Sequence, residues 1–168
     1  MSKSSEHVES PQDGVRAYGA AALGGRLRRL SERIDREAKA IYEGRGLDFE
    51  QRWFPVFNCL RNGETLSVTD LADRLQVSHV SVSVIRAALE GRGLVETRPD
   101  PKDGRRRVLA LTPKGKAVAS DMAPLFDALD TVAIELNAEA GDAIATIARL
   151  EDALERKSLA TRVEDLQA

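Results

Sequence analysis

The sequence predicts a mainly α-helical protein with one small β-hairpin, a fold of the α+β class. Near each end of the chain, apolar residues recur at spacings of three and four, which is typical of long helices. Between these stretches, two short helical patterns precede a segment in which the apolar period changes to two, as in a strand. With 168 residues, 42% of them hydrophobic, the chain is long enough to bury one core.

Two helices are predicted in the N-terminal third. Residues 1–20 are rich in Ser, Glu, Asp and Gly, and we expect them to form a flexible tail. The first helix then runs to about Gly44, with one apolar face formed by Leu23, Leu27, Leu30, Ile34, Ala38 and Ile41. The second runs from Phe49 to Leu60 and supplies bulky core side chains. Asn62 and Gly63 are expected to end it.

A helix-turn-helix is predicted in the middle of the chain. The stretch SVTDLADRLQVSHVSVSVIRAALEGRGLVE divides into a short helix over Val68–Leu75, a tight turn through Gln76 and Val77, and a second helix capped by Ser78. Each helix has a buried face of apolar residues at helical spacing: Leu71, Ala72 and Leu75, then Val82, Ile85 and Leu89. In this layout the first helix braces the second, whose N-terminal half can enter the major groove of DNA.

A β-hairpin and two further helices are predicted after it. Residues 94–98 and 106–111 are expected to be strands joined by a turn over residues 99–104. Thr112 is a predicted N-cap followed by proline, and it opens a long helix with the apolar residues Leu125, Leu129, Val132 and Leu136. After a turn near Ala140 and Gly141, the last helix has an apolar face of Ile144, Ile147, Leu150 and Leu154.

The hairpin concentrates basic side chains in an otherwise acidic chain. Its sequence is RPDPKDGRRRVLAL, residues 98–111, whereas the formal net charge of the whole chain is -2. Residues 61–116 hold 11 Lys or Arg against 7 Asp or Glu, a balance of +4, and residues 127–168 hold 4 against 10, a balance of -6. A local basic patch is typical of a nucleic-acid surface, and a solvated charged face is the alternative.

A helix-turn-helix followed by such a hairpin is a winged helix. With the recognition helix in the major groove, the hairpin lies along flanking phosphates and its tip can reach the minor groove, where arginine is favoured. We expect Asp103 to brace the turn, because an unneutralised carboxylate would be repelled by DNA. The candidate DNA-binding residues of the hairpin are Arg98, Lys102, Arg105, Arg106 and Arg107.

The stretch GLVETRPDPKDGRRRVLALTPKGKAV resembles the wing and following helix of the MarR family of bacterial transcription regulators. The family pattern is roughly G-L-V, a basic residue, D-P, D-x-R, then L-T and G, and the resemblance covers about Leu23 to Leu154. It implies a winged helix-turn-helix with long N- and C-terminal dimerisation helices. It also implies a homodimer that binds an inverted-repeat operator in double-stranded DNA and is often released by a small molecule. The family's minor-groove arginine maps onto Arg105 and its structural aspartate onto Asp103.

The recognition helix departs from the family pattern. Relatives often carry a basic side chain after the serine that is Ser83 here, whereas this chain has Val84. Small hydroxyls can bond phosphates or several base edges, so polar side chains of this helix remain candidates for DNA binding. Helix capping and solvent exposure are the alternative explanation. These candidates are Ser78, His79, Ser81, Ser83 and Arg86.

An effector site and a redox site are further candidates. Tyr42, Arg52, Trp53 and Phe57 form a candidate pocket for an aromatic or anionic effector, with plain core packing as the alternative for the aromatic side chains. Cys59 is either a buried structural thiol or a redox sensor. Family members that sense oxidants do so through a cysteine in the first helix, whereas Cys59 lies in the second.

Enzymes, metalloproteins and membrane proteins are disfavoured by the sequence. It has no phosphate-cradling glycine loop, no Gly-x-Ser-x-Gly elbow and no histidine with acidic partners at metal spacing, so we expect no catalysis and no cofactor. One cysteine and two histidines leave little to bind a metal. No apolar run approaches the roughly 18 residues of a membrane span, and residues 1–20 lack the apolar centre of a signal peptide, so a soluble cytoplasmic protein is expected.

Two classes of function remain. The first is a dimeric, sequence-specific DNA-binding transcription regulator, a repressor modulated by a small molecule. The second is a winged-helix interaction module that uses its basic wing on an acidic protein partner. DNA is favoured because polar groups on the recognition helix occur together with arginines on the wing. The expected segments are a tail (1–20), N-terminal helices (21–62), the winged helix-turn-helix (63–113), C-terminal dimerisation helices (114–157) and a second tail (158–168).

Overall fold

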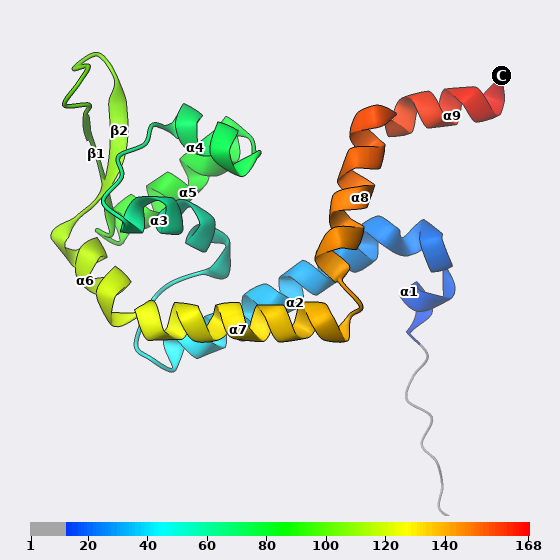
Figure 1. Cartoon of the computed structure of the whole chain (residues 1–168), viewed down its shortest axis with the longest axis horizontal. Coiled ribbons are helices and arrows are strands. Elements are labelled where there is room, and N and C mark those ends of the chain that lie inside the picture. The colour runs from blue at the N-terminus through cyan, green and yellow to red at the C-terminus, as the bar shows by residue number, and fades with distance from the viewer. Residues whose placement is uncertain (1–12) are drawn as a thin grey trace, which may run out of the picture. The chain divides into compact units, whose positions relative to one another are not determined.

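The computed structural model describes residues 13–168, and the chain divides into two compact units, Met1–Gly115 and Lys116–Ala168 (Figure 1). The first unit contains helices and one two-stranded antiparallel hairpin, and the second consists of helices. The first unit holds α1 (Gly14–Ala17), η1 (Gly19–Ala22), α2 (Leu23–Glu43), η2 (Gln51–Trp53), α3 (Phe54–Arg61), α4 (Val68–Leu75), α5 (His79–Gly91), β1 (Val95–Pro99) and β2 (Arg107–Leu111). Helix α6 (Pro113–Asp121) spans the boundary, and the second unit continues with α7 (Ala123–Glu139), α8 (Ala143–Arg156) and α9 (Leu159–Gln167).

The predicted helix-turn-helix is confirmed as α4 and α5, which pack on each other and on α3. A capping box starts α4: the Ser67 hydroxyl accepts the backbone N–H of Asp70, and the Asp70 carboxylate accepts the N–H of Ser67 at 2.8 Å. The turn contains Gln76 in the left-handed conformation, with φ of 52°. Ser78 caps α5 as expected, since its hydroxyl accepts the N–H of Ser81 at 3.0 Å.

The predicted hairpin is confirmed with small shifts of its ends. Strands β1 and β2 pair antiparallel, from Val95 opposite Leu111 to Pro99 opposite Arg107. The segment before α4 bonds to the other edge of β2, because Leu66 and Leu109 exchange two backbone hydrogen bonds of 2.8 and 3.3 Å. This bridge ties the base of the wing to the start of the helix-turn-helix.

The core of the first unit combines an aromatic cluster with aliphatic side chains. The rings of Tyr42, Trp53 and Phe57 meet the ring of Phe49 edge to face, with centroids 5.2, 5.6 and 5.3 Å away. Phe49 was expected inside the second helix, but it lies in the connection before η2, and α3 begins only at Phe54. The aliphatic side chains that are fully buried are Val56, Leu60, Leu71, Val82, Leu89, Val108 and Leu109.

The single long helix predicted after Thr112 is wrong. The Thr112 hydroxyl does accept the N–H of Gly115 at 3.0 Å, which starts α6 as expected. Helix α6 then ends at Asp121 and α7 begins at Ala123, with Pro124 in its first turn. Proline has no N–H to donate and its ring clashes with the carbonyl four residues earlier, so the helix cannot run through Pro124 undisturbed.

The two predicted tails also differ from the structure. Residues 14–22 form α1 and η1, and the N-cap Asp13 pairs with Arg29 at 2.7 Å, which lowers the pKa of Asp13 to about 2. Residues 1–12 lie outside the described part of the chain. At the other end, residues 159–167 form helix α9, because Ser158 caps it by accepting the N–H of Thr161 at 3.2 Å.

An apolar stripe of partly exposed side chains runs along α2. Leu23, Leu27, Leu30, Ile34 and Ile41 occupy one face at helical spacing, and each is between 41% and 54% exposed. In the second unit, Val132, Ile134, Leu136, Ile144 and Leu154 are 47% to 70% exposed. Within residues 13–168, none of the helices is both long and apolar enough to cross a membrane.

Candidate nucleic-acid interface

The N-terminal half of α5 presents an open surface. Val82 is fully buried and points to the core, so the residues on the opposite side of the helix are exposed. His79 and Ser81 are exposed and Ser83 is half-buried. The hydroxyls of Ser78 and Ser81 are bonded to each other at 2.8 Å, and Ser78 also caps the helix, so these two serines have a structural role whether or not they contact DNA.

The wing turn is held by its own acidic side chains. The Asp103 carboxylate accepts the backbone N–H of Arg105 at 3.0 Å, and its carbonyl accepts the N–H of Arg106 at 2.9 Å. The Asp100 carboxylate likewise accepts the N–H of Lys102 at 2.8 Å. Asp103 therefore fixes the backbone of the turn and leaves the Arg105 guanidinium without a partner among residues 13–168, a geometry that fits a bracing residue.

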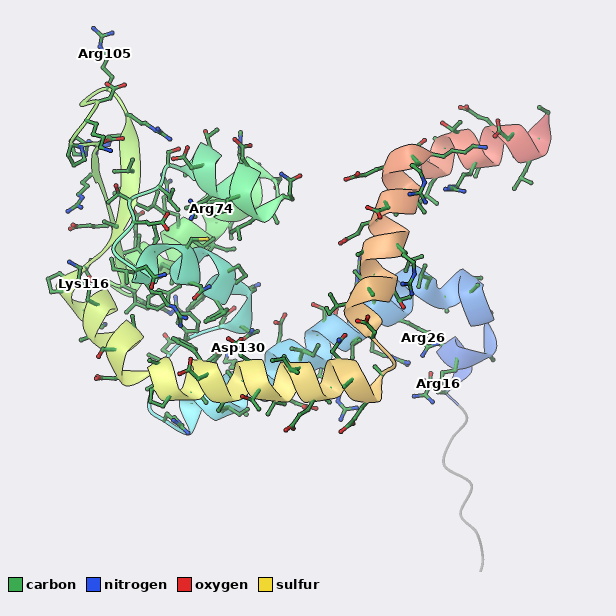
Figure 2. All side chains as sticks on the ribbon, viewed as in Figure 1. Arg16, Arg26, Arg74, Arg105, Lys116 and Asp130 are labelled. Atoms are coloured by element: carbon green, nitrogen blue, oxygen red, sulfur yellow. The ribbon has the colours of Figure 1, made fainter. Side chains whose placement is uncertain are left out.

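Three basic side chains at the wing are available for a ligand. Figure 2 shows Arg105 projecting from the tip of the hairpin, away from the helices of the first unit. Lys102, Arg105 and Arg107 are exposed, and within residues 13–168 their side chains make no hydrogen bond or ion pair. An extended strand pair with unpaired cations at its tip can reach a polyanion without first breaking an internal contact.

Arg106, a predicted DNA-binding residue, is paired within the chain. Its guanidinium donates to the Asp70 carboxylate and to the Ser67 hydroxyl, the latter at 3.0 Å, so it joins the wing to the capping box of α4. Hydrogen bonds from the Ser67 backbone N–H, the Ser67 hydroxyl and Arg106 lower the pKa of the Asp70 carboxyl, outweighing partial burial, which raises it. This contact is therefore complete above the usual carboxyl pKa of about 4 and is lost only as the pH falls through the lowered value.

Two other predicted arginines are held by neighbouring acids. The Arg98 guanidinium lies 3.7 Å from the Glu96 carboxylate on β1. Arg86 lies 3.8 Å from Glu90 on α5, and its Nε is buried without a hydrogen-bond partner among the described residues. Glu90 in turn accepts the Thr97 hydroxyl, so α5 and β1 are connected through it. Arg86 thus belongs to the joint between the recognition helix and the wing.

A shallow hollow lies beside the N-terminus of α4. It measures about 470 Å³ and is lined by Ser67, Val68, Thr69, Arg106 and Arg107. The free N–H groups of a helix N-terminus attract anions, and the guanidinium of Arg107 adds a full positive charge. The hollow is therefore suited to a phosphate group of a DNA backbone.

The candidate effector pocket is a packed core instead of a cavity. Tyr42, Trp53 and Phe57 are at most 2% exposed, and the ring of Phe49 packs against all three. Burial raises the pKa of Tyr42 to about 12, and its hydroxyl donates to Gln51 at 2.6 Å. The Arg52 guanidinium pairs with the Glu50 carboxylate at 2.5 Å, and its side chain is two-thirds exposed. The guanidinium carbon of Arg92 lies 4.2 Å from the centroid of the Trp53 ring, so Arg92 covers this ring of the cluster.

Among residues 13–168, neither Cys59 nor a cluster of potential metal-binding side chains forms a further site. Cys59 is a free, half-buried thiol in α3, next to the buried Leu60. Among residues 13–168, no three His, Cys, Asp or Glu side chains gather as they would around a metal ion.

A family model described as MarR family matches residues 46–106, from the aromatic cluster through α4 and α5 to the wing. This segment of the chain is therefore similar to the MarR family. The matched segment contains the capping box, the recognition helix and the Asp103 turn, which are the features that build the site. No curated protein sequence matches the chain significantly.

Solved structures of MarR-type regulators have the same winged-helix fold. BpsR of Bordetella bronchiseptica, whose DNA binding is regulated by 6-hydroxynicotinic acid, is 22% identical over 77% of this chain and 93% of its own, with a TM-score of 0.61. MepR of S. aureus, solved in complex with DNA, is 20% identical over 79% of this chain and 97% of its own, with a TM-score of 0.61. PcaV of Streptomyces coelicolor, solved with its natural ligand, is 21% identical over 82% of this chain and 94% of its own, with a TM-score of 0.58. At these identities the likeness concerns the fold alone.

Sequence reasoning missed three parts of the site. The capping box Ser67–Asp70 is visible as a Ser-x-x-Asp pattern, but its contact with Arg106 joins residues 36 positions apart. The Glu90–Thr97 bond is another contact between separate elements. Val80 and Val84 are 72% and 63% exposed on α5, although valines are usually assigned to a core.

Proposed function

We propose that this protein is a MarR-family regulator that acts as a homodimeric repressor, binding an inverted-repeat operator and releasing it when a small molecule binds. In this proposal α5 lies in the major groove, and the wing follows the phosphates to place Arg105 in the adjacent minor groove. Lys102 and Arg107 contact phosphates, and Arg106 positions the wing.

The free Arg105 at the tip of a braced wing is the observation that best supports the proposal. An arginine kept unpaired while its neighbours Asp103 and Asp100 bond backbone groups is set to meet an external anion. The wing base is joined to the recognition unit by the Leu66–Leu109 bridge and by Arg106, so both DNA-contacting elements move together. An acidic protein partner would explain the cations but not the exposed front of α5.

Selection of bound sequences from a random DNA pool tests this function. We expect an enriched inverted repeat whose two halves lie about one helical turn apart, since a two-fold symmetric dimer presents two recognition helices. Enrichment of no sequence, together with binding that salt abolishes equally for all DNA, would contradict the proposal.

The effector part of the proposal draws on the ligands of BpsR and PcaV. A small molecule releases DNA if it binds the free dimer better than the bound one, and the shift is limited by that difference. Titration of the protein–operator complex with 6-hydroxynicotinic acid, followed by fluorescence anisotropy, tests one such compound. Release would support this ligand class, and unchanged anisotropy at millimolar concentration would contradict it.

Replacing Arg105 by alanine should weaken operator binding by about 1–3 kcal/mol, because a charge-assisted minor-groove contact is lost. Arg105→Lys should recover only part, since an ammonium is costlier to desolvate than a guanidinium. The loss should be larger when the operator has A·T-rich flanks than when it has G·C-rich flanks. Equal binding of Arg105→Ala and the parent to both operators would show that the wing tip does not enter the groove.

The exposed stripe of α2 predicts a dimer at micromolar concentration. Five apolar side chains along one helix face need a partner, and the arginines beside them attract the acidic residues 127–168 of a second copy. Leu30→Glu should shift the sedimentation coefficient to that of a monomer. Arg28→Glu, on the opposite face of α2, should not. A parent protein that sediments as a monomer would contradict the prediction.

A further inference from the structure

The front of α5 is apolar where base-reading helices usually carry polar groups. Val80 and Val84 are 72% and 63% exposed, whereas Val82 between them is fully buried. A helix turns by about 100° per residue, so residues two positions before and after Val82 lie on the side opposite the core. Being four positions apart, Val80 and Val84 also stand one above the other on the same face.

Folding does not account for these two valines. On an exposed helix face, β-branched side chains lose rotamer freedom and gain no burial, so alanine or a polar residue would favour the helix more. Of the polar groups beside them, the Ser78 and Ser81 hydroxyls bond each other, and the Arg86 guanidinium lies 3.8 Å from the Glu90 carboxylate. The N-terminal half of α5 therefore offers a ligand mainly stiff methyl groups, with the His79 imidazole next to them.

We propose that Val80 and Val84 contact thymine 5-methyl groups in the major groove and select A·T pairs at those positions of the operator. Thymine is the base that presents a methyl group there, and apolar side chains recognise it by packing against it. The exposed cations of the wing, Lys102, Arg105 and Arg107, belong to the same unit and give the surface the charge needed to hold DNA. This inference rests on the proposed DNA-binding function and specifies which bases the recognition helix reads.

Deoxyuridine in place of thymidine isolates the methyl group, because the two bases pair alike and differ only at that position. The probe is the sequence enriched from the random pool, synthesised with thymidine or with deoxyuridine at each thymine of one half-site in turn. The parent protein should bind about three- to fivefold more weakly when a contacted thymine loses its methyl group, the factor expected from one buried methyl.

Val80→Ala and Val84→Ala should each abolish the distinction between thymidine and deoxyuridine at one position and leave the others unchanged. The matched control is Val163→Ala, which removes an exposed valine from α9, 52% exposed, and should keep every distinction. Alanine favours helices, so the variants are expected to fold, and unchanged binding to random DNA at low salt verifies this.

The outcomes separate this inference from the function on which it rests. Loss of methyl discrimination in the two valine variants supports it. Tight, sequence-specific binding by a parent protein that treats thymidine and deoxyuridine alike overturns the methyl contact and leaves the regulator function standing. The same holds if both valine variants still discriminate as the parent does. A parent protein that enriches no DNA sequence overturns both.

Discussion

Asp70→Ala is expected to weaken operator binding about tenfold, or ~1.4 kcal/mol, although it removes a negative charge from the DNA-facing unit. Electrostatics alone predicts the opposite sign, since a protein with one carboxylate fewer should bind a polyanion more tightly. The loss arises because Asp70 holds Arg106 and, through it, the wing. Fluorescence anisotropy with operator DNA measures the change.

Asp73→Ala is the matched control for this prediction. Asp73 lies on the same helix and is exposed, and its carboxylate makes no hydrogen bond or ion pair within residues 13–168. Its removal should leave affinity unchanged or slightly increase it. Tighter binding by both variants would show that Asp70 acts only through its charge and that the brace does not position the wing.

The double variant Asp70→Ala with Arg106→Ala separates positioning from direct phosphate contact. If Arg106 acts through Asp70, the double variant should bind DNA no more weakly than the single variant with the lower affinity. The effects on binding free energy would then differ from additivity by about 0.5–3 kcal/mol. If Arg106 contacts a phosphate independently, the two losses should add. Arg107→Ala should instead weaken specific and random DNA alike, because its side chain is free to contact the backbone.

Gly115→Ala is expected to lower the free energy of unfolding by about 2 kcal/mol, as overpacking does in a close-packed site. A Cβ at this position would lie 2.0 Å from the Leu94 carbonyl oxygen and 3.4 Å from the Leu111 side chain. The Leu94 carbonyl also accepts the N–H of Thr112 at 3.1 Å, so it cannot move without disturbing the cap of α6. Urea denaturation measures the effect, and the gain of about 1 kcal/mol in helix propensity is too small to cancel it.

Gly91→Ala provides the comparison within the same unit. Gly91 ends α5, and a Cβ there would have no neighbour within 4 Å. This change should leave the unfolding free energy unchanged or raise it slightly. If Gly115→Ala and Gly91→Ala had equal free energies of unfolding, the close approach of α6 to the backbone carbonyl of Leu94 would not constrain the fold.

The sequence alone determined the elements whose signals are local. Apolar spacing located α2, α4 and α5, because a helix face repeats every three or four residues whatever it packs against. Ser78 and Thr112 were recognised as caps since a cap bonds an N–H only a few residues away. The turn at Asp103 and the exposed tip at Arg105 were likewise predictable from PKDGRRR. Pro124 is a local signal for the break between α6 and α7. The break was not predicted because the apolar residues after Thr112 were interpreted as one continuous helix face.

Only the tertiary structure decided which side chains are free and which are held. The sequence does not distinguish the neighbours Arg106 and Arg107, yet Arg106 contacts a capping box formed 36 residues earlier, while the Arg107 side chain makes no hydrogen bond or ion pair within residues 13–168. Tyr42, Trp53 and Phe57 suit a pocket or a core equally well, and the ring of Phe49 filled the space between them. Val80 and Val82 are the same residue two positions apart, and the packing of α5 buried one and exposed the other. Periodicity reports the neighbours of a residue along the chain, whereas these contacts depend on distant segments that meet only when the chain folds.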